Sequence, residues 1–274
     1  MPNCTNNPGS EETKKFMELK QSTFEEIIES ERQLVVDAEA HYGKPYRDAR
    51  ACSIFLSRSI ISVDASRQEM FGRFFALLKK HHMLALLSTL RLHKVQSMMN
   101  LRQVLEAGAA AAFAIVNPEL RHFANADSTG MILDPSQELT KKRYQWLAAN
   151  FPKGSDAIKA KKERINIATS HANVVSASQT FRVNKNGDTI DAPFFDIEDE
   201  YHVKADLWLT SSIAIELMDL LYGVNESHGV IEFTPNFVAY LTHAAQENAA
   251  LHAEITSTDR FKRAMEKQRA RTPT

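Results

Sequence analysis

Apolar residues recur at steps of three, four and seven along most of the chain, which is the spacing of one face of an α-helix. Between residues 11 and 41, Glu and Lys separate apolar positions that include Phe16, Phe24, Ile28 and Val35. This pattern predicts one long helix over 11–41, followed by a second helix over about 46–63. Residues 1–10 are polar and rich in turn-forming residues, so we expect a disordered N-terminal tail.

A longer apolar pattern runs from Met83 to Val116, with an expected break between 92 and 96. Its run of small residues, Ala107 to Ala112, allows another helix to approach closely, and we place this segment at the centre of a bundle. Together with the aromatic face at Phe71, Phe74 and Phe75, it supplies enough apolar surface to predict self-association. Further helical patterns cover about 136–150, 155–181, 198–222 and 235–252, and a basic C-terminal helix is expected over 258–270.

Residues 181–190 carry the clearest β pattern. Asn186-Gly187 lies between two short extended runs, and this pair favours a tight hairpin because both central residues need a positive φ. The sequence therefore predicts an all-α protein, a multi-helix bundle with one small β-hairpin near 181–195, in a single helical domain over 11–274.

Composition excludes several classes of protein. The chain of 274 residues has 33 Lys and Arg against 34 Asp and Glu, which excludes a strongly basic protein that coats nucleic acid by bulk charge. Its two cysteines exclude a disulfide scaffold. The most apolar stretch, Val104 to Val116, is shorter than the roughly 20 residues of a membrane span and contains Glu106. We expect a cytoplasmic protein with no membrane partner.

Charge is distributed unevenly. Residues 141–164 hold eight Lys and Arg against two acids, whereas residues 188–206 hold seven acids against Lys204. One interpretation is two solvated faces that attract each other. The other is a basic strip that contacts phosphates, with Lys159, Lys161 and Lys162 as candidate nucleic-acid-binding residues.

The strongest candidate for chemistry is the pair Arg164 and His171. Seven helical steps of about 100° return close to the starting direction, so both side chains share one helix face. A guanidinium can hold a phosphate and an imidazole can move a proton, and Asn166 and Ser170 add polar groups nearby. These groups suit RNA cleavage in which a 2′-hydroxyl attacks the adjacent phosphate. The same pair also fits a structural role as a buried polar pair.

Arg102 and Glu106 lie four residues apart in apolar surroundings. This spacing predicts a supporting ion pair in the interior, near the Arg164–His171 helix, or an ordinary pair within one helix. The segments 119–122 and 199–202 each resemble half of a carboxylate-bridged metal site, for which Glu106 and Glu216 are further candidates. A di-metal helical protein is thus a third alternative, and the favoured interpretation needs no metal and no cofactor.

The arrangement of these motifs resembles a family of uncharacterised bacterial all-helical proteins. It consists of Arg-x-x-x-Glu on a central apolar helix, then Ser-His near the end of another helix some 60 residues later. That motif is similar to the one of HEPN ribonucleases, an Arg and a His separated by four to six residues. Arg164 and His171 match it with six between them, although Ile165 replaces the usual polar residue after the Arg.

The resemblance covers about residues 80–225. It implies a homodimer that brings two motifs together and cleaves RNA without a metal, in a toxin–antitoxin or phage-defence system with a cognate regulatory protein. The alternative is a catalytically inactive helical protein-interaction module.

Overall fold

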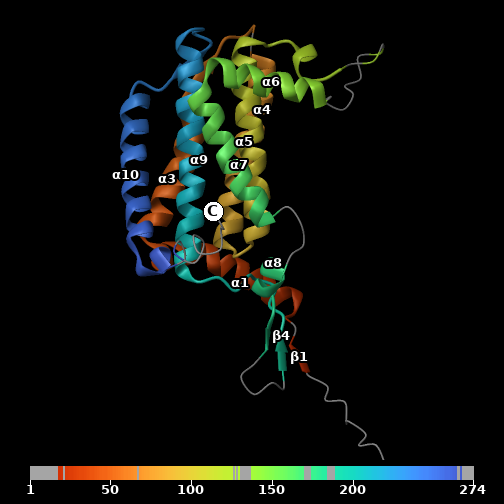
Figure 1. Ribbon diagram of the computed structural model, residues 1–274, viewed down its shortest axis with the longest axis vertical. Coiled ribbons are helices and arrows are strands. Elements are labelled where there is room, and N and C mark those ends of the chain that lie inside the picture. The colour runs from red at the N-terminus through yellow and green to blue at the C-terminus, as the bar shows by residue number, and fades with distance from the viewer. Residues whose placement is uncertain are drawn as a thin grey trace, which may run out of the picture.

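The computed structural model describes residues 18–20, 22–66, 68–125, 127, 129, 137–169, 174–183, 189–263 and 266. Helices dominate these residues, and the predicted all-α bundle is confirmed (Figure 1). The helices are α1 Phe24–Val36, α2 Ala38–Tyr42, α3 Lys44–Arg58, α4 Gln68–Leu90, α5 Lys94–Val116, η1 Leu120–His122, α6 Gln137–Asn150, α7 Pro152–Thr169, α8 Val174–Gln179, α9 Glu200–Glu226 and α10 Phe237–Ser257. The strands are β1 Glu18–Lys20, β2 Ile60–Val63, β3 Arg182–Val183, β4 Thr189–Asp191 and β5 Ile231–Phe233.

The centre of the bundle is formed by α5, which packs against α4, α7 and α9 (Figure 1). The predicted central position of the small-residue run is confirmed, because every residue from Ala107 to Ala112 is buried. At Gly108, an added Cβ would lie 2.6 Å from Leu217 Cδ2 of α9, so glycine permits this close approach. Phe71 and Phe75 are also buried in this core, so they are not available to another copy of the chain.

The long helix predicted over 11–41 is wrong in its extent. Residues 11–17 lie outside the described part, and the segment contains α1 and α2 with a break at Asp37. Thr23 begins α1 with a capping box to Glu26, and Gln33 donates a 2.6 Å hydrogen bond to Asp37 at the break. No residue of α1 is buried, so core packing does not hold it in line with α2.

The helix predicted over about 46–63 ends earlier, at Arg58. Residues Ile60 to Val63 form β2, which pairs antiparallel with β5 of the distant segment Ile231–Phe233. Three of the four residues in β2 are β-branched, a preference that suits a strand once a pairing partner exists. The sequence pattern alone did not supply that partner.

The predicted small hairpin is confirmed by the antiparallel pairing of β3 with β4, where Arg182 lies opposite Asp191. Its expected Asn-Gly turn lies outside the described residues. An unexpected third strand, β1, pairs parallel with β4, with Glu18 opposite Thr189. This small sheet lies at one end of the bundle, whereas α6 crosses the other end (Figure 1). The predicted tail over 1–10 also lies outside the described residues.

One helix of the described part, α9, is long and apolar enough to cross a membrane by length and composition. The most apolar window of α9 is 72% buried inside the bundle, as expected for the core helix of a globular fold. Sequence reasoning placed the most apolar stretch at Val104 to Val116 and did not single out α9. At the C-terminal end, residues 259–263 are helical, and most of the remaining basic segment lies outside the described residues.

Candidate functional site

The predicted site residues on α7 divide between two faces of that helix. Asn166 accepts a 2.9 Å hydrogen bond from Arg102 Nη1 of α5, while Arg164 lies over Trp208 of α9. Residues two apart on a helix point about 200° from one another, so Arg164 and Asn166 cannot serve one site from the same helix. The expectation that Asn166 supports Arg164 is therefore wrong. Ser170 and His171 lie outside the described residues.

Arg164 has an exposed side chain whose Cζ atom is 5.8 Å from the centre of the Trp208 ring. The indole is partly buried and also stacks with the exposed His252 of α10, with ring centres 4.5 Å apart. Within the described ranges, Arg164 forms no hydrogen bond and no ion pair with another side chain. Its guanidinium donors are thus available to an anion, and the aromatic stack beside them is partly exposed.

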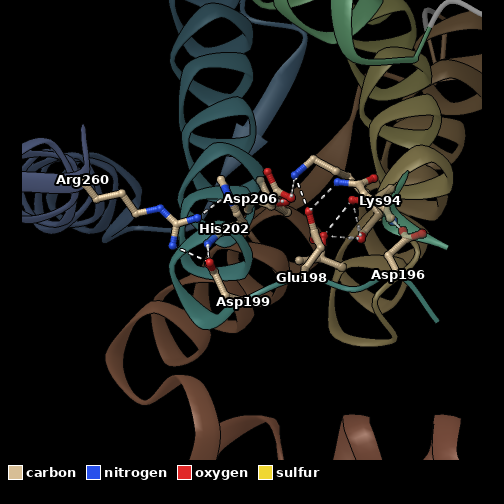
Figure 2. Close-up of polar contacts among 12 residues, drawn as sticks. Lys94, Asp196, Glu198, Asp199, His202, Asp206 and Arg260 are labelled. Atoms are coloured by element: carbon tan, nitrogen blue, oxygen red, sulfur yellow. Dashed lines mark hydrogen bonds and ion pairs between the residues drawn. The ribbon is translucent and has the colours of Figure 1, made fainter. Parts of the chain in front are cut away.

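A largely buried ion cluster joins the N-terminus of α5 to α9 (Figure 2), and its Asp206 is attracted by Arg164. Lys94 Nζ lies 2.5 Å from Glu198 Oε1 and 3.3 Å from Asp206 Oδ2, and the Lys94 amide donates to Asp196 Oδ2 at 2.6 Å. Burial raises the pKa of Asp206 to about 6, although Lys94 opposes this increase. Burial acts against the charge of Lys94, but Asp206 and Glu198 outweigh it and raise the pKa of that ammonium.

A second branch of the cluster connects α9 to the C-terminal segment (Figure 2). Arg260 pairs with Asp199, donates to His202 Nε2 at 2.9 Å and lies 4.9 Å from the centre of the Tyr201 ring. Burial, with help from Lys94, lowers the pKa of His202. Because Nε2 accepts a hydrogen bond from a guanidinium, His202 is neutral in this arrangement. Three acids of the segment 188–206, Glu198, Asp206 and Asp199, are thus paired with Lys94 or Arg260.

The pair Arg102–Glu106 has the predicted contact with α7 but not the predicted interior position. Glu106 Oε1 lies 3.2 Å from Arg102 Nε and 3.0 Å from Lys162 Nζ. The side chains of Arg102 and Glu106 are 45% and 37% exposed, so the pair lies at the surface of the bundle. Burial acts to raise the pKa of Glu106, but Lys162 and Arg102 together lower it.

The three lysines predicted to bind nucleic acid differ in their surroundings. Lys161 pairs with Glu216 of α9, and Lys162 pairs with Glu106 and donates to Tyr144 at 3.0 Å. Lys159 is exposed and forms no ion pair within the part of the chain that the structure describes. Ion pairing therefore compensates two of the three predicted cations, and only Lys159 is free to contact phosphate.

The two segments that resemble half of a metal site take part in other interactions. Asp199 caps α9 by accepting a hydrogen bond from the His202 amide at 3.2 Å, and Glu119 pairs with Arg121. Among the described residues, no group of three or more His, Cys, Asp or Glu side chains is placed to hold a metal ion.

Sequence reasoning missed Lys94, Asp206 and Trp208. Lys94 had one available indication, because a cation in the first turn of a helix is unfavourable unless an acid compensates it. Comparisons with protein-family models, curated proteins and solved structures found no match for this chain. What the chain does must therefore be inferred from the arrangement of its own side chains.

Proposed function

We propose that this chain is an endoribonuclease of the HEPN-like kind, which binds single-stranded RNA at Arg164 and cleaves it without using a metal ion. The observation that carries the proposal is the exposed Arg164 guanidinium over the partly exposed Trp208 ring, with no ion pair to Arg164 at contact distance among the described residues. A guanidinium binds a phosphate through two parallel hydrogen bonds. The exposed His252 ring, which stacks on the Trp208 indole, offers an aromatic surface for a base, and a cation beside such a surface is the usual combination in single-strand binding.

The reaction is an internal displacement at phosphorus. The RNA 2′-oxygen forms a bond to the adjacent phosphorus, and the bond from phosphorus to the 5′-oxygen of the next nucleotide breaks. A base removes the proton of the 2′-hydroxyl, and an acid donates a proton to the leaving 5′-oxygen. The products are a 2′,3′-cyclic phosphate and a 5′-hydroxyl.

We assign both proton transfers to His171, one from each copy in a two-fold dimer. An imidazole titrates near neutral pH and can act as either base or acid. Arg164 of each copy stabilises the negative charge that increases on the phosphate oxygens during the displacement. The exposed Lys159 lies on the Asn166 face of the same helix, away from Arg164, and can contact only a more distant part of the RNA backbone.

The test is an RNA cleavage assay with a fluorescent single strand and the full chain. We expect His171→Ala to lower the cleavage rate by about 10²–10⁴-fold with binding retained. Arg164→Ala is expected to weaken binding and slow cleavage together. Arg47→Ala is the matched control, because Arg47 is similarly exposed but lies on α3 and pairs with Glu39. Equal cleavage by all variants and wild type would overturn the proposal.

A catalytically inactive interaction module is the second candidate, and α1 favours it. None of its residues is buried, and Phe24 and Val36 are 70% and 61% exposed. Phe24 and Ile28, which is 50% exposed, lie four residues apart on one helix face, and contiguous exposed apolar side chains are typical of surfaces that contact a partner. If RNA is neither bound nor cleaved, and Phe24→Ser abolishes association with a partner protein while the fold is kept, this second function replaces the first.

A further inference from the structure

A cavity of about 480 Å³ lies between α4, α5, η1 and α6, away from Arg164. Its wall is mainly apolar, with Phe74 and Leu77 from α4, Ala107 and Ala110 from α5, and Phe123 after η1. The two alanines leave space that larger side chains of α5 would fill. Cavities of about this size, mainly apolar with a few polar groups, are typical of small-molecule sites.

Arg143 of α6 is one of four polar side chains in the wall of this cavity, with Gln103, Glu106 and Arg73, and Arg73 is paired with Glu69. The Cζ atom of Arg143 lies 5.6 Å from the centre of the Phe123 ring and 6.0 Å from that of Phe74. The one hydrogen bond recorded for it among the described residues goes to the Thr140 hydroxyl, at 3.1 Å. Burial lowers the pKa of this guanidinium, although Tyr144 and Glu106 act in the opposite direction.

The acid nearest in the cavity wall does not neutralise Arg143. Glu106 Oε1 accepts from Arg102 at 3.2 Å and from Lys162 at 3.0 Å, so two other cations share its charge. No carboxylate of the described residues lies within ion-pair distance of Arg143. A partly buried guanidinium is costly without a partner, and an anion that enters the cavity would supply one.

We propose that this cavity binds a monocarboxylate with an apolar body, such as a medium-chain alkyl acid. The carboxylate would pair with the donors of Arg143, whose planar fork matches its two oxygens. The alkyl chain would lie between Phe74 and Phe123 on one side and Ala107 and Ala110 on the other. This inference is independent of RNA cleavage, because it uses neither Arg164 nor His171.

The test is calorimetric titration of the full chain with three probes: decanoate, decan-1-ol and decylamine. These probes share one alkyl chain and differ in the charge of the head group. We expect decanoate to bind at least tenfold more tightly than the alcohol, and decylamine not to bind, since charge-assisted hydrogen bonds contribute about this much.

Two variants locate the binding. Arg143→Gln is expected to weaken decanoate binding about tenfold or more, whereas Lys142→Gln removes the same charge from the neighbouring exposed position and is expected to leave it unchanged. Leu77→Glu places an anion at the partly exposed wall of the cavity and is expected to abolish binding without disturbing the core.

Each contrary result overturns the proposal. If decanoate and the alcohol bind equally, the cavity does not select an anion. If Arg143→Gln and Lys142→Gln weaken binding equally, or if no probe binds to the wild-type chain, Arg143 is not the anchor of a ligand site. Cleavage of RNA by the same preparations reports separately on the proposed nuclease.

Discussion

Acid destabilisation of the bundle is expected to depend on His82. This side chain of α4 is 0% exposed, and its Nε2 lies 3.2 Å from the Thr210 carbonyl oxygen of α9. Within the described part of the chain, Nδ1 has no hydrogen-bond partner. Burial lowers the pKa of His82 from 6.5 to about 4, although the Thr210 carbonyl opposes this. The imidazole is therefore neutral in the folded protein at neutral pH.

The sign of the effect follows from proton linkage. Above pH 6.5, His82 is neutral in both states and its contribution to stability is fully present. As the pH falls, the unfolded chain binds a proton that the folded chain accepts only near pH 4. From these two pKa values, the free energy of unfolding falls by about 2 kcal/mol at pH 5 and about 3 kcal/mol at pH 4, relative to neutral pH.

The measurement is urea unfolding followed by circular dichroism across this pH range, comparing wild type with His82→Gln. Gln does not titrate and can still donate to Thr210, so the difference between the two profiles isolates the imidazole. We expect the wild type to lose about 2 kcal/mol more than the variant between neutral pH and about pH 5. His228→Gln, at an exposed position, is the control and is expected to follow the wild-type profile. Parallel wild-type and His82→Gln profiles would refute this account.

Three further predictions use the same unfolding assay. For Asp206→Asn the pH dependence has the opposite sign to that for His82, because burial raises the pKa of Asp206 from 3.8 to about 6. As the pH rises across that range, the free energy of unfolding of the wild type should fall by about 3 kcal/mol relative to the variant. A difference in unfolding free energy that does not change with pH would contradict this assignment. Gly72→Ala should stabilise the protein by about 1 kcal/mol, because alanine favours the helix and the added Cβ meets no atom within 4 Å. Gly108→Ala should lose that gain or destabilise the protein by up to about 2 kcal/mol, because its added Cβ would lie 2.6 Å from Leu217 Cδ2. Glu106→Gln should lower the free energy of unfolding by less than about 1 kcal/mol, because the Arg102–Glu106 ion pair is partly exposed. A decrease of about 3 kcal/mol or more would instead indicate a buried ion pair.

The helices of the core were predictable because their side-chain periodicity reflects burial directly. Ala107 to Ala112 had to face another helix, and α9 meets it there. The Asn-Gly pair predicted the β3–β4 hairpin because that turn needs only neighbouring residues. In contrast, β2 exists because of pairing with β5, which lies about 170 residues later in the sequence. Local patterns carry no information on such a partner.

The candidate site was predictable only in part, for a related reason. Helix geometry alone places Asn166 away from Arg164, so that error could have been avoided from the sequence. The interior position expected for Arg102 and Glu106 failed because their apolar neighbours face other directions around α5. The pairing of Lys94 with Glu198 and Asp206 joins residues about a hundred positions apart. The position of Lys94 at a helix N-terminus indicated that acids were needed, but not which ones.

The distribution of ion pairs explains how a chain of net charge −1 can still have a local site for a polyanion. Lys94 and Arg260 pair with Glu198, Asp206 and Asp199 of the acidic segment 188–206. Arg164 of the basic strip 141–164 also attracts Asp206, in line with the interpretation that the two segments attract each other. Acids outside the acidic segment pair with Lys161 and Lys162. Coulomb interactions are strong only over short distances in salt, so the remaining acids of the chain do not cancel the field at an exposed cation. Arg164 therefore keeps an exposed guanidinium beside Trp208 that the total charge does not reveal.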